Sequence, residues 1–352
     1  MKEKILFMAE KKNTGLGLQE TKGNFQLRGV TTGTTKDNFY KELTTKSNKP
    51  MRMVNFGINI DKNKAVYIGL NGMEKETVFF SKSEGKGKER KTITEKVAWK
   101  DRLSFKKDGF RPIGVNLGIV KITDASGNEV NDKQTKFEYD ACKYIADNLV
   151  DDVSVFVKGK LEFSTYNDAH QTRYTPNQIS LCKPIDFDEE DFAPLGNFEQ
   201  VIVFMGISKN DDGTFTVLAK IVTYNSVEDA EFIVENAKLA KNLKSLKPYT
   251  AIKVFGDIRV EHDVEEIEEE DDGWGTPNPM ERVNNPTVRL LVITGADKES
   301  IDTDTYSEET IAEALAKIKS NKKADKDYGD TSDDGWGSAD IKSADDDEDE
   351  EW

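Results

Sequence analysis

Alternating apolar and polar residues in the first half of the chain predict a set of strands around one helix. Strands are predicted at 25–30, 51–60, 65–70, 77–80, 153–163 and 178–181, with a polar turn at 61–64. Apolar residues recur at helical spacing between Phe137 and Leu149, which predicts an amphipathic helix there. This order of elements is that of an OB-fold barrel, in which Gly159 is expected to mark a bend or bulge of the long strand.

The second half of the chain repeats this order. Strands are predicted at 200–207, 215–224 and 231–234, then a Lys-rich helix before Pro248, a strand at 251–260 with Gly256 inside it, and a closing strand at 287–293. The tripeptide GNF occurs at 23–25 and again at 196–198. A tripeptide can recur by chance, but the shared element order indicates a duplicated architecture. A last helix, 308–319, is capped by Ser307 and carries one apolar stripe, so we expect it to dock on the second half.

The predicted fold class is therefore mainly β, a β-barrel type with interspersed helices. We expect two tandem OB-fold-like barrels, a C-terminal helix and a disordered acidic tail. The predicted divisions are an N-terminal arm (1–22), a first OB-like domain (23–186) with a basic insertion (81–111), an acidic linker (187–195), a second OB-like domain (196–298) with an acidic insertion (263–286), a C-terminal helix (299–320) and the tail (321–352). Because the stretch 81–107 is too long and polar for a hairpin turn, we expect it to be an exposed excursion.

Composition favours a soluble protein with a sparse core, since 36% of the 352 residues are hydrophobic and 33% are charged. The two cysteines and two histidines are scattered, without metal-ligand spacing or a disulfide framework. We therefore expect no metal and no cofactor, and a reducing cytoplasm as the location. The apolar run 5–8 near the N-terminus is too short for a signal peptide or a membrane span.

Motifs of the common enzyme classes do not occur in the sequence. There is no P-loop, no GxSxG and no HExxH, and no Cys/His pair at catalytic spacing. The many carboxylates occur in runs, which is typical of solvated segments. The pairs Asp271-Asp272 and Asp333-Asp334 leave Mg²⁺ binding as a minor alternative. The sequence therefore favours a binding protein over an enzyme.

The negative charge of the chain is confined to two segments. The net charge is −16, while residues 321–352 hold 13 acidic and 4 basic residues, a net of −9. Residues 263–272 hold 8 acidic residues and no basic one, so the rest of the chain carries +1. Within that rest, 81–111 holds 11 basic and 5 acidic residues, a net of +6. This segregation indicates a basic surface and an acidic segment that can compete for it.

The basic segment is the first candidate nucleic-acid site. Its candidate residues are Lys82, Lys86, Lys88, Arg90, Lys91, Lys96, Trp99, Lys100, Arg102, Phe105, Lys106 and Lys107. Single-strand binders combine cations that follow the phosphates with aromatic rings on which any base can stack. The alternative for Trp99, and for the neighbouring Phe110, is that they are core residues beneath a solvated Lys-rich loop.

A second candidate group follows the first helix. It comprises Lys158, Lys160, Tyr166, Arg173 and Tyr174. The stretch Val157–Leu161 with Ser164–Tyr166 resembles a strand and turn of bacterial single-stranded DNA-binding proteins, where valine, glycine, basic and aromatic residues recur. Many OB barrels share this pattern, so it is moderately specific.

The C-terminus combines charge with an aromatic end. The tail residues Asp345, Asp346, Asp347, Glu348, Asp349, Glu350 and Glu351 precede a terminal Trp352. Such a tail is a portable ligand, because the charge steers it to a basic surface and the indole anchors in a pocket. The pentapeptide DDGWG, at 271–275 and 333–337, places two more tryptophans in acidic surroundings. The alternative is a solubilising tail with an accidental last residue.

An acidic tail with a hydrophobic end also resembles the C-termini of single-stranded DNA-binding proteins of bacteria and certain phages. The resemblance implies an OB-fold protein, most plausibly of a phage replication type, that coats single-stranded DNA and recruits replication or recombination proteins through its tail. In this family the tail also competes with DNA for the protein's own groove. The bacterial family has one barrel per chain, a Gly/Pro/Gln-rich linker and a Pro-Phe tip, so tetramer formation and partner identity do not carry over. A two-barrel monomer is consistent with the sequence.

These patterns predict non-sequence-specific binding of single-stranded DNA in replication, recombination or repair, without a membrane partner. For a phage-encoded protein, the site of action would be the cytoplasm of the bacterial host. An alternative is an OB-fold scaffold of the replication machinery that binds nucleic acid weakly. A third class, an acidic DNA mimic or an enzyme accessory subunit, has no specific support in the sequence.

Overall fold

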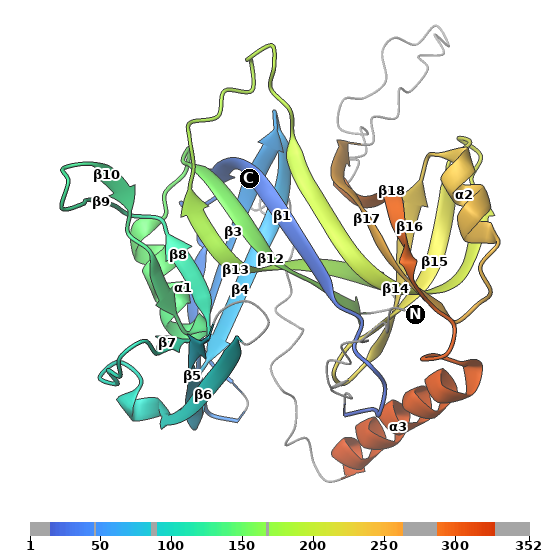
Figure 1. Cartoon of the computed structure of the whole chain (residues 1–352), viewed down its shortest axis with the longest axis horizontal. Helices are drawn as coiled ribbons and strands as arrows, with labels where there is room; N and C mark the ends of the chain where they lie inside the picture. The colour runs from blue at the N-terminus through green and yellow to red at the C-terminus, as the bar shows by residue number, and fades with distance from the viewer. Residues whose placement is uncertain (1–14, 46, 86–89, 167–168, 263–286, 328–352) are drawn as a thin grey trace, which may run out of the picture.

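The structure is a computed structural model that describes residues 15–45, 47–85, 90–166, 169–262 and 287–327. The protein is mainly β, and two barrels lie side by side in the view of Figure 1. None of the helices in the described part of the chain combines the length and hydropathy that a membrane span needs.

Five long strands form the first barrel. They are β1 (Gly23–Thr32), β3 (Pro50–Asp61), β4 (Lys64–Met73), β12 (Ser154–Tyr166) and β13 (Ala169–Leu181). Antiparallel pairs join β1 to β3, β3 to β4, β12 to β13 and β12 back to β1, while β13 pairs with β4 in parallel. The circuit is closed, and it is the strand order of an OB-fold barrel.

The second barrel repeats the circuit strand for strand. Its strands are β14 (Leu195–Lys209), β15 (Phe215–Val222), β16 (Val227–Val234), β17 (Thr250–His262) and β18 (Thr287–Asp302). Again four pairs are antiparallel, and the pairing of the third strand, β16, with the last, β18, is parallel. The predicted duplication is confirmed, because all five strands of the second barrel pair in the same order and orientation as those of the first.

Helices close the barrels and smaller strands decorate the first one. The helices are α1 (Glu138–Asn148), α2 (Ala237–Lys244), α3 (Glu308–Asp327) and a 3-10 turn at Trp99–Asp101; the short strands are β2 (Tyr40–Thr44), β5 (Thr77–Glu84), β6 (Lys91–Ala98), β7 (Arg111–Pro112), β8 (Val115–Gly118), β9 (Lys121–Thr123), β10 (Glu129–Asn131) and β11 (Gln134–Lys136). Both predicted barrel helices, α1 and α2, are confirmed. The last helix is longer than predicted, since α3 continues to Asp327.

An approximate two-fold axis relates the barrels. Strands β1 and β14 pair antiparallel, with Phe25 opposite Phe198 at the centre of the register. On its outer side Phe25 pairs with Gly159 of β12, and Phe198 pairs with Gly256 of β17. The register shifts beside each glycine, which confirms the predicted bulge at Gly159. The four strands therefore form one continuous sheet across the junction (Figure 1).

One hydrophobic core runs through both barrels. Phe163 of the first barrel contacts Phe232 of the second, with ring centroids 6.1 Å apart, and Phe232 stacks on Phe198 at 5.9 Å. The barrels therefore share buried aromatic surface, and each ring buried in this way contributes on the order of 2 kcal/mol.

The residues just before β1 are packed, which differs from the expected N-terminal arm. Leu16 and Leu18 are buried against Tyr306 and Ile311 at the α3 side of the second barrel. The Tyr306 hydroxyl donates a 2.7 Å hydrogen bond to the Gln19 carbonyl. The reason is local, because two leucines in a polar segment supply the apolar surface that α3 covers. The predicted docking of the last helix on the second barrel is confirmed.

Candidate nucleic-acid interface

In an OB fold, oligonucleotides bind on the outer face of the second and third strands and on the adjoining loops. In the first barrel these strands are β3 and β4. Val54, Phe56 and Ile58 are buried in the core, so their neighbours along β3 face outward. The outward residues of this face, the β3–β4 face, are Asn55, Gly57 and Asn59 on β3 and Tyr67, Gly69 and Asn71 on β4.

An exposed aromatic ring stands at the centre of the β3–β4 face. Tyr67 is 52% exposed and lies directly opposite Gly57 in the strand register. Arg289, from β18 of the second barrel, places its guanidinium carbon 4.6 Å from the Tyr67 ring centroid. The Arg289 Nε also donates a 3.1 Å hydrogen bond to the Ala65 carbonyl. A residue of one barrel therefore orients an exposed ring of the other.

A second arginine crosses the same face. Arg173 of β13 donates a 2.7 Å hydrogen bond to the Asn71 side-chain oxygen. A Cβ atom at Gly69 would lie 3.1 Å from two nitrogens of this guanidinium, so the glycine leaves room for it. Burial lowers the pKa of Arg173, and the nearby Glu162 carboxylate opposes this shift. An arginine stays cationic after such a shift. The face thus combines a ring, fixed cations and amides, which suits a single strand.

The basic insertion is folded, which differs from the expected exposed excursion. Strands β5, β6 and β7 form a small sheet of their own. Its inner side holds a small core made of Val78, Phe80, Val97, Trp99 and Phe137. Alternating apolar residues within the Lys-rich sequence supply this core, and the lysines stay on its outside.

Trp99 is part of this small core. It is therefore a core residue, as the alternative interpretation of the sequence had it, and not an exposed stacking platform. Its exposed fraction is 9%, its Nε1 donates a 2.8 Å hydrogen bond to Glu74, and the Arg102 guanidinium carbon lies 3.9 Å from the ring. Arg102 in turn makes two hydrogen bonds to Asp140, at 2.9 and 3.0 Å. Phe105 packs 4.5 Å from the Phe80 ring centroid. Base stacking on Trp99 would require this packing to open.

The exposed ring of the insertion is Phe79, which sequence reasoning did not select. Phe79 is 46% exposed and pairs in register with Lys96. Ile113 lies on its other side, because its backbone N–H donates to the Phe79 carbonyl at 3.0 Å. Arg111 pairs with Ser81, one position further along this outer face. Of two adjacent phenylalanines in a strand only one can face the core, and this alternation was the available signal.

The other predicted cations of the insertion lie on its small sheet and on the turn and loop that follow β6. Lys91, Lys96, Lys100 and Lys106 are exposed. Lys82 forms an ion pair with Glu84 at 3.2 Å, Arg90 donates to Ser83 at 3.1 Å, and Lys107 pairs with Glu95. Lys86 and Lys88 lie outside the described residues.

The second predicted group is divided between the outer surface and the core. Lys158 and Lys160 are exposed on β12, beside Gln26 and Asn24 of β1, whereas Arg173 reaches over β4. Tyr174 is 3% exposed and packs edge-on against Phe25 at 5.3 Å, so it is a core residue, and burial raises its pKa. The Tyr166 side chain lies outside the described part, as do the tail residues 345–352.

The corresponding face of the second barrel carries different chemistry. On β15 and β16, Lys220 forms a 2.6 Å ion pair with Asp229, and the exposed Leu218 lies opposite Glu231. This face therefore carries an ion pair, one further carboxylate and an exposed leucine, where the β3–β4 face carries an exposed ring and two arginines. Among the described residues there is also no cluster of three or more His, Cys, Asp or Glu side chains that could hold a metal ion.

Comparison with known proteins identifies the family. The family model YorF matches residues 84–331, which include most of the insertion, α1 and the whole second barrel. The chain belongs to the YorF family. No curated protein sequence matches this YorF-family chain.

Solved structures similar to this YorF-family chain include two of the single-stranded DNA-binding protein from Thermus aquaticus. A deletion mutant of that protein has 9% sequence identity and a TM-score of 0.36, over 82% of this chain and 98% of the other. The wild-type protein has 9% identity and a TM-score of 0.34, over 78% and 91%. The strand pairing of each barrel by itself shows the OB fold.

Proposed function

We propose that this protein binds single-stranded DNA without marked sequence preference, as a binding protein and not an enzyme. The observation that supports this most is the exposed Tyr67 on the β3–β4 face, flanked by Arg289 and Arg173. Every base has a π-face, so a ring of this kind accepts any base. In a duplex the bases are stacked on one another, so this arrangement favours a single strand.

The insertion extends this surface. Phe79 repeats the arrangement of an exposed ring beside cations, here Lys96 and Arg111. Residues 81–111 carry a net charge of +6, which attracts the phosphates and makes binding dependent on salt. Two ring-and-cation patches on one barrel favour contact with several nucleotides.

We also propose a specific biological role for this binding activity. The protein would coat single-stranded DNA during phage replication, recombination or repair, in the cytoplasm of a bacterial host. Its acidic tail, ending in Trp352, would recruit protein partners. The support for this role is the resemblance of the tail and the division of charge between the tail and the insertion.

The Tyr67→Ala variant tests the binding face. Loss of one stacked base should weaken binding of oligo-dT by about 1–3 kcal/mol, measured by fluorescence anisotropy. Tyr67→Phe keeps the ring and should stay close to the wild type. Tyr224→Ala is the matched control, because Tyr224 is also exposed, at 62%, but lies in the turn between β15 and β16. Equal affinities of Tyr67→Ala and Tyr224→Ala would exclude Tyr67 from the site.

The acidic second barrel favours one alternative, an OB-fold scaffold that holds a basic protein partner and binds DNA weakly. Its support is Glu231 beside the exposed Leu218, next to the Lys220–Asp229 ion pair. Salt titration separates the two functions. A DNA-binding protein should lose affinity for oligo-dT steeply between 50 and 200 mM salt, roughly in proportion to the phosphates contacted.

A further inference from the structure

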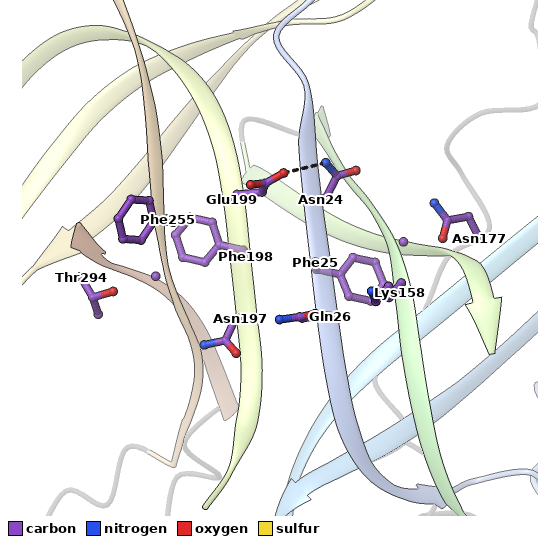
Figure 2. Close-up of a pocket in the computed structure, with 12 residues that line it drawn as sticks. Asn24, Phe25, Gln26, Lys158, Asn177, Asn197, Phe198, Glu199, Phe255 and Thr294 are labelled. Atoms are coloured by element: carbon purple, nitrogen blue, oxygen red, sulfur yellow. Dashed lines mark hydrogen bonds between the residues drawn. The ribbon is translucent and has the colours of Figure 1, made fainter. Parts of the chain in front are cut away.

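A pocket of 510 Å³ lies on the two-fold junction between the barrels. Its floor is the central sheet, and the residues around it come from strands of both barrels (Figure 2). Phe25 and Phe198, the buried pair at the centre of the β1–β14 register, lie beneath it. The pocket is separate from the β3–β4 face described above.

The backbone of this pocket is symmetric. Asn24 and Gln26 flank Phe25, and Asn197 and Glu199 flank Phe198 at the matching positions. The bulged glycines of β12 and β17 occupy equivalent places on the two sides. The duplication thus brought two copies of one local structure together around a single cavity.

The side chains at the two ends of the pocket are not symmetric. The residue before the first glycine is Lys158, and the residue before the second is Phe255. Phe255 is 44% exposed and lies in β17 (Thr250–His262), beside the register shift at Gly256. One end of the pocket therefore offers a cation and the other an aromatic ring. They stand on strands three spacings apart, about 14 Å.

The carboxylates near the pocket are already paired within the sheet. Glu199 forms a 2.7 Å ion pair with Lys253 and accepts a 3.2 Å hydrogen bond from Asn24. These contacts, the Lys253 bond first, lower the pKa of Glu199. Asp257 accepts a 2.7 Å hydrogen bond from Asn197. Lys253 therefore offsets the charge of Glu199, whereas the Asp257 carboxylate is held by a neutral amide.

We infer that this pocket binds a short stretch of single-stranded DNA, with a base stacked on Phe255 and a phosphate at Lys158. The amides between them supply donors and acceptors for base edges. A lining of asparagine, glutamine, lysine and threonine suits a nucleotide better than the apolar face of a second copy of the chain. The inference rests on the proposed function and extends it to a second contact region.

The strand order connects the two regions. The outer surface runs from β4, with Tyr67, across β13 and β12 to β1 and β14, and ends at β17 with Phe255. Arg173 on β13 and the lysines 158 and 160 on β12 lie along this route. One strand of DNA that leaves the β3–β4 face therefore meets cations on its way to the pocket.

Binding of an oligo-dT length series tests the inference. In Phe255→Ala, affinity should be unchanged for the shortest oligonucleotide that binds and should fall roughly five- to hundredfold for long ones, because the pocket is reached by long strands alone. Lys158→Gln should weaken the binding of long oligonucleotides by a similar factor. Phe255→Leu keeps the apolar bulk without the ring and guards against a folding defect. Tyr224→Ala should match the wild type at every length.

The outcomes separate the pocket from the proposed function. If Tyr67→Ala weakens all lengths while Phe255→Ala and Lys158→Gln change none, the pocket inference is wrong and the proposed function stands. If the wild-type protein does not bind oligo-dT, the proposed function itself is wrong. If Phe255→Ala turns a dimer into a monomer in sedimentation velocity without changing DNA affinity, a second copy covers the pocket and the inference is overturned. Photocross-linking of bromodeoxyuridine DNA to the peptide that holds Phe255 would support it directly.

Discussion

The face of the strand on which a side chain lies decides whether an aromatic residue supports the fold or is open to a ligand. Phe80 is 3% exposed and its neighbour Phe79 is 46% exposed, on one strand of the insertion. In the same way Tyr174 packs in the core, whereas Tyr67 stands on the β3–β4 face. A phenylalanine and a tyrosine ring can each stack on a base. Of these four rings, only the exposed Phe79 and Tyr67 are accessible to DNA.

Trp99 provides a test at this scale. Removing a buried indole, as in Trp99→Ala, should destabilise the insertion by about 3–5 kcal/mol, and Trp99→Phe should cost less because most of the packing is kept. Chemical denaturation measures both effects. If Trp99→Phe keeps its stability but loses most of its oligo-dT affinity, the indole contacts DNA and the core assignment is incomplete.

Among the elements, periodicity in the sequence located the long strands and the barrel helices because their patterns are local. It did not locate the short strands β6 to β11. Of these, β8 pairs with the distant β13, whereas β6 and the β9–β10 pair are hairpin strands in polar sequence without a clear apolar alternation. The candidate site has the same limit. Arg289 and Ala65 are 224 positions apart in the chain, so no local pattern could join Arg289 to the Tyr67 ring. The lysines were visible from composition, whereas their ion pairs depend on the fold.

The bulged strands β12 and β17 each contain a glycine where a larger residue would clash, and this requirement can be tested. A Cβ atom at Gly159 would lie 2.1 Å from the Thr175 carbonyl oxygen and 2.6 Å from the Phe25 ring. Gly159→Ala should therefore destabilise the first barrel by about 1–3 kcal/mol or more, in thermal or urea unfolding. Gly206→Ala is the control in a strand, since a Cβ there meets no atom within 4 Å. Equal stability of the two variants would show that the bulge relaxes easily.

At the scale of the whole molecule, the duplicated barrels share one core but differ in charge. The β3–β4 face and the insertion carry exposed rings with cations, and the matching face of the second barrel carries Asp229 and Glu231. Under the proposed function, one barrel would bind the polyanion while the other contributes Arg289 and half of the pocket. The second barrel would thus position the binding surface of the first one.

Charge division also predicts competition between the acidic tail and DNA. Because α3 extends to Asp327, deletion of 328–352 spares the helix and removes 11 acidic residues and 1 basic residue, a net of −10. A tethered tail acts at a high effective concentration, so weak attraction can occupy a basic surface between encounters with DNA. The deletion should therefore tighten oligo-dT binding at low salt. The gain should fade above about 0.1 M salt, where the Debye length falls below about 10 Å.

Deletion of Trp352 alone is the matched control, because it leaves the side-chain charge of the tail unchanged. This variant should keep wild-type DNA affinity at every salt concentration and lose capture of a replication protein in pull-downs, since the indole and not the charge would fill a partner's pocket. Anisotropy titrations at 20 and 200 mM salt compare the three proteins. Equal affinity of the full-length and the 328–352-deleted protein at 20 mM salt would exclude competition. Capture that is indifferent to Trp352 would exclude the indole as the anchor and leave the tail with a purely electrostatic role.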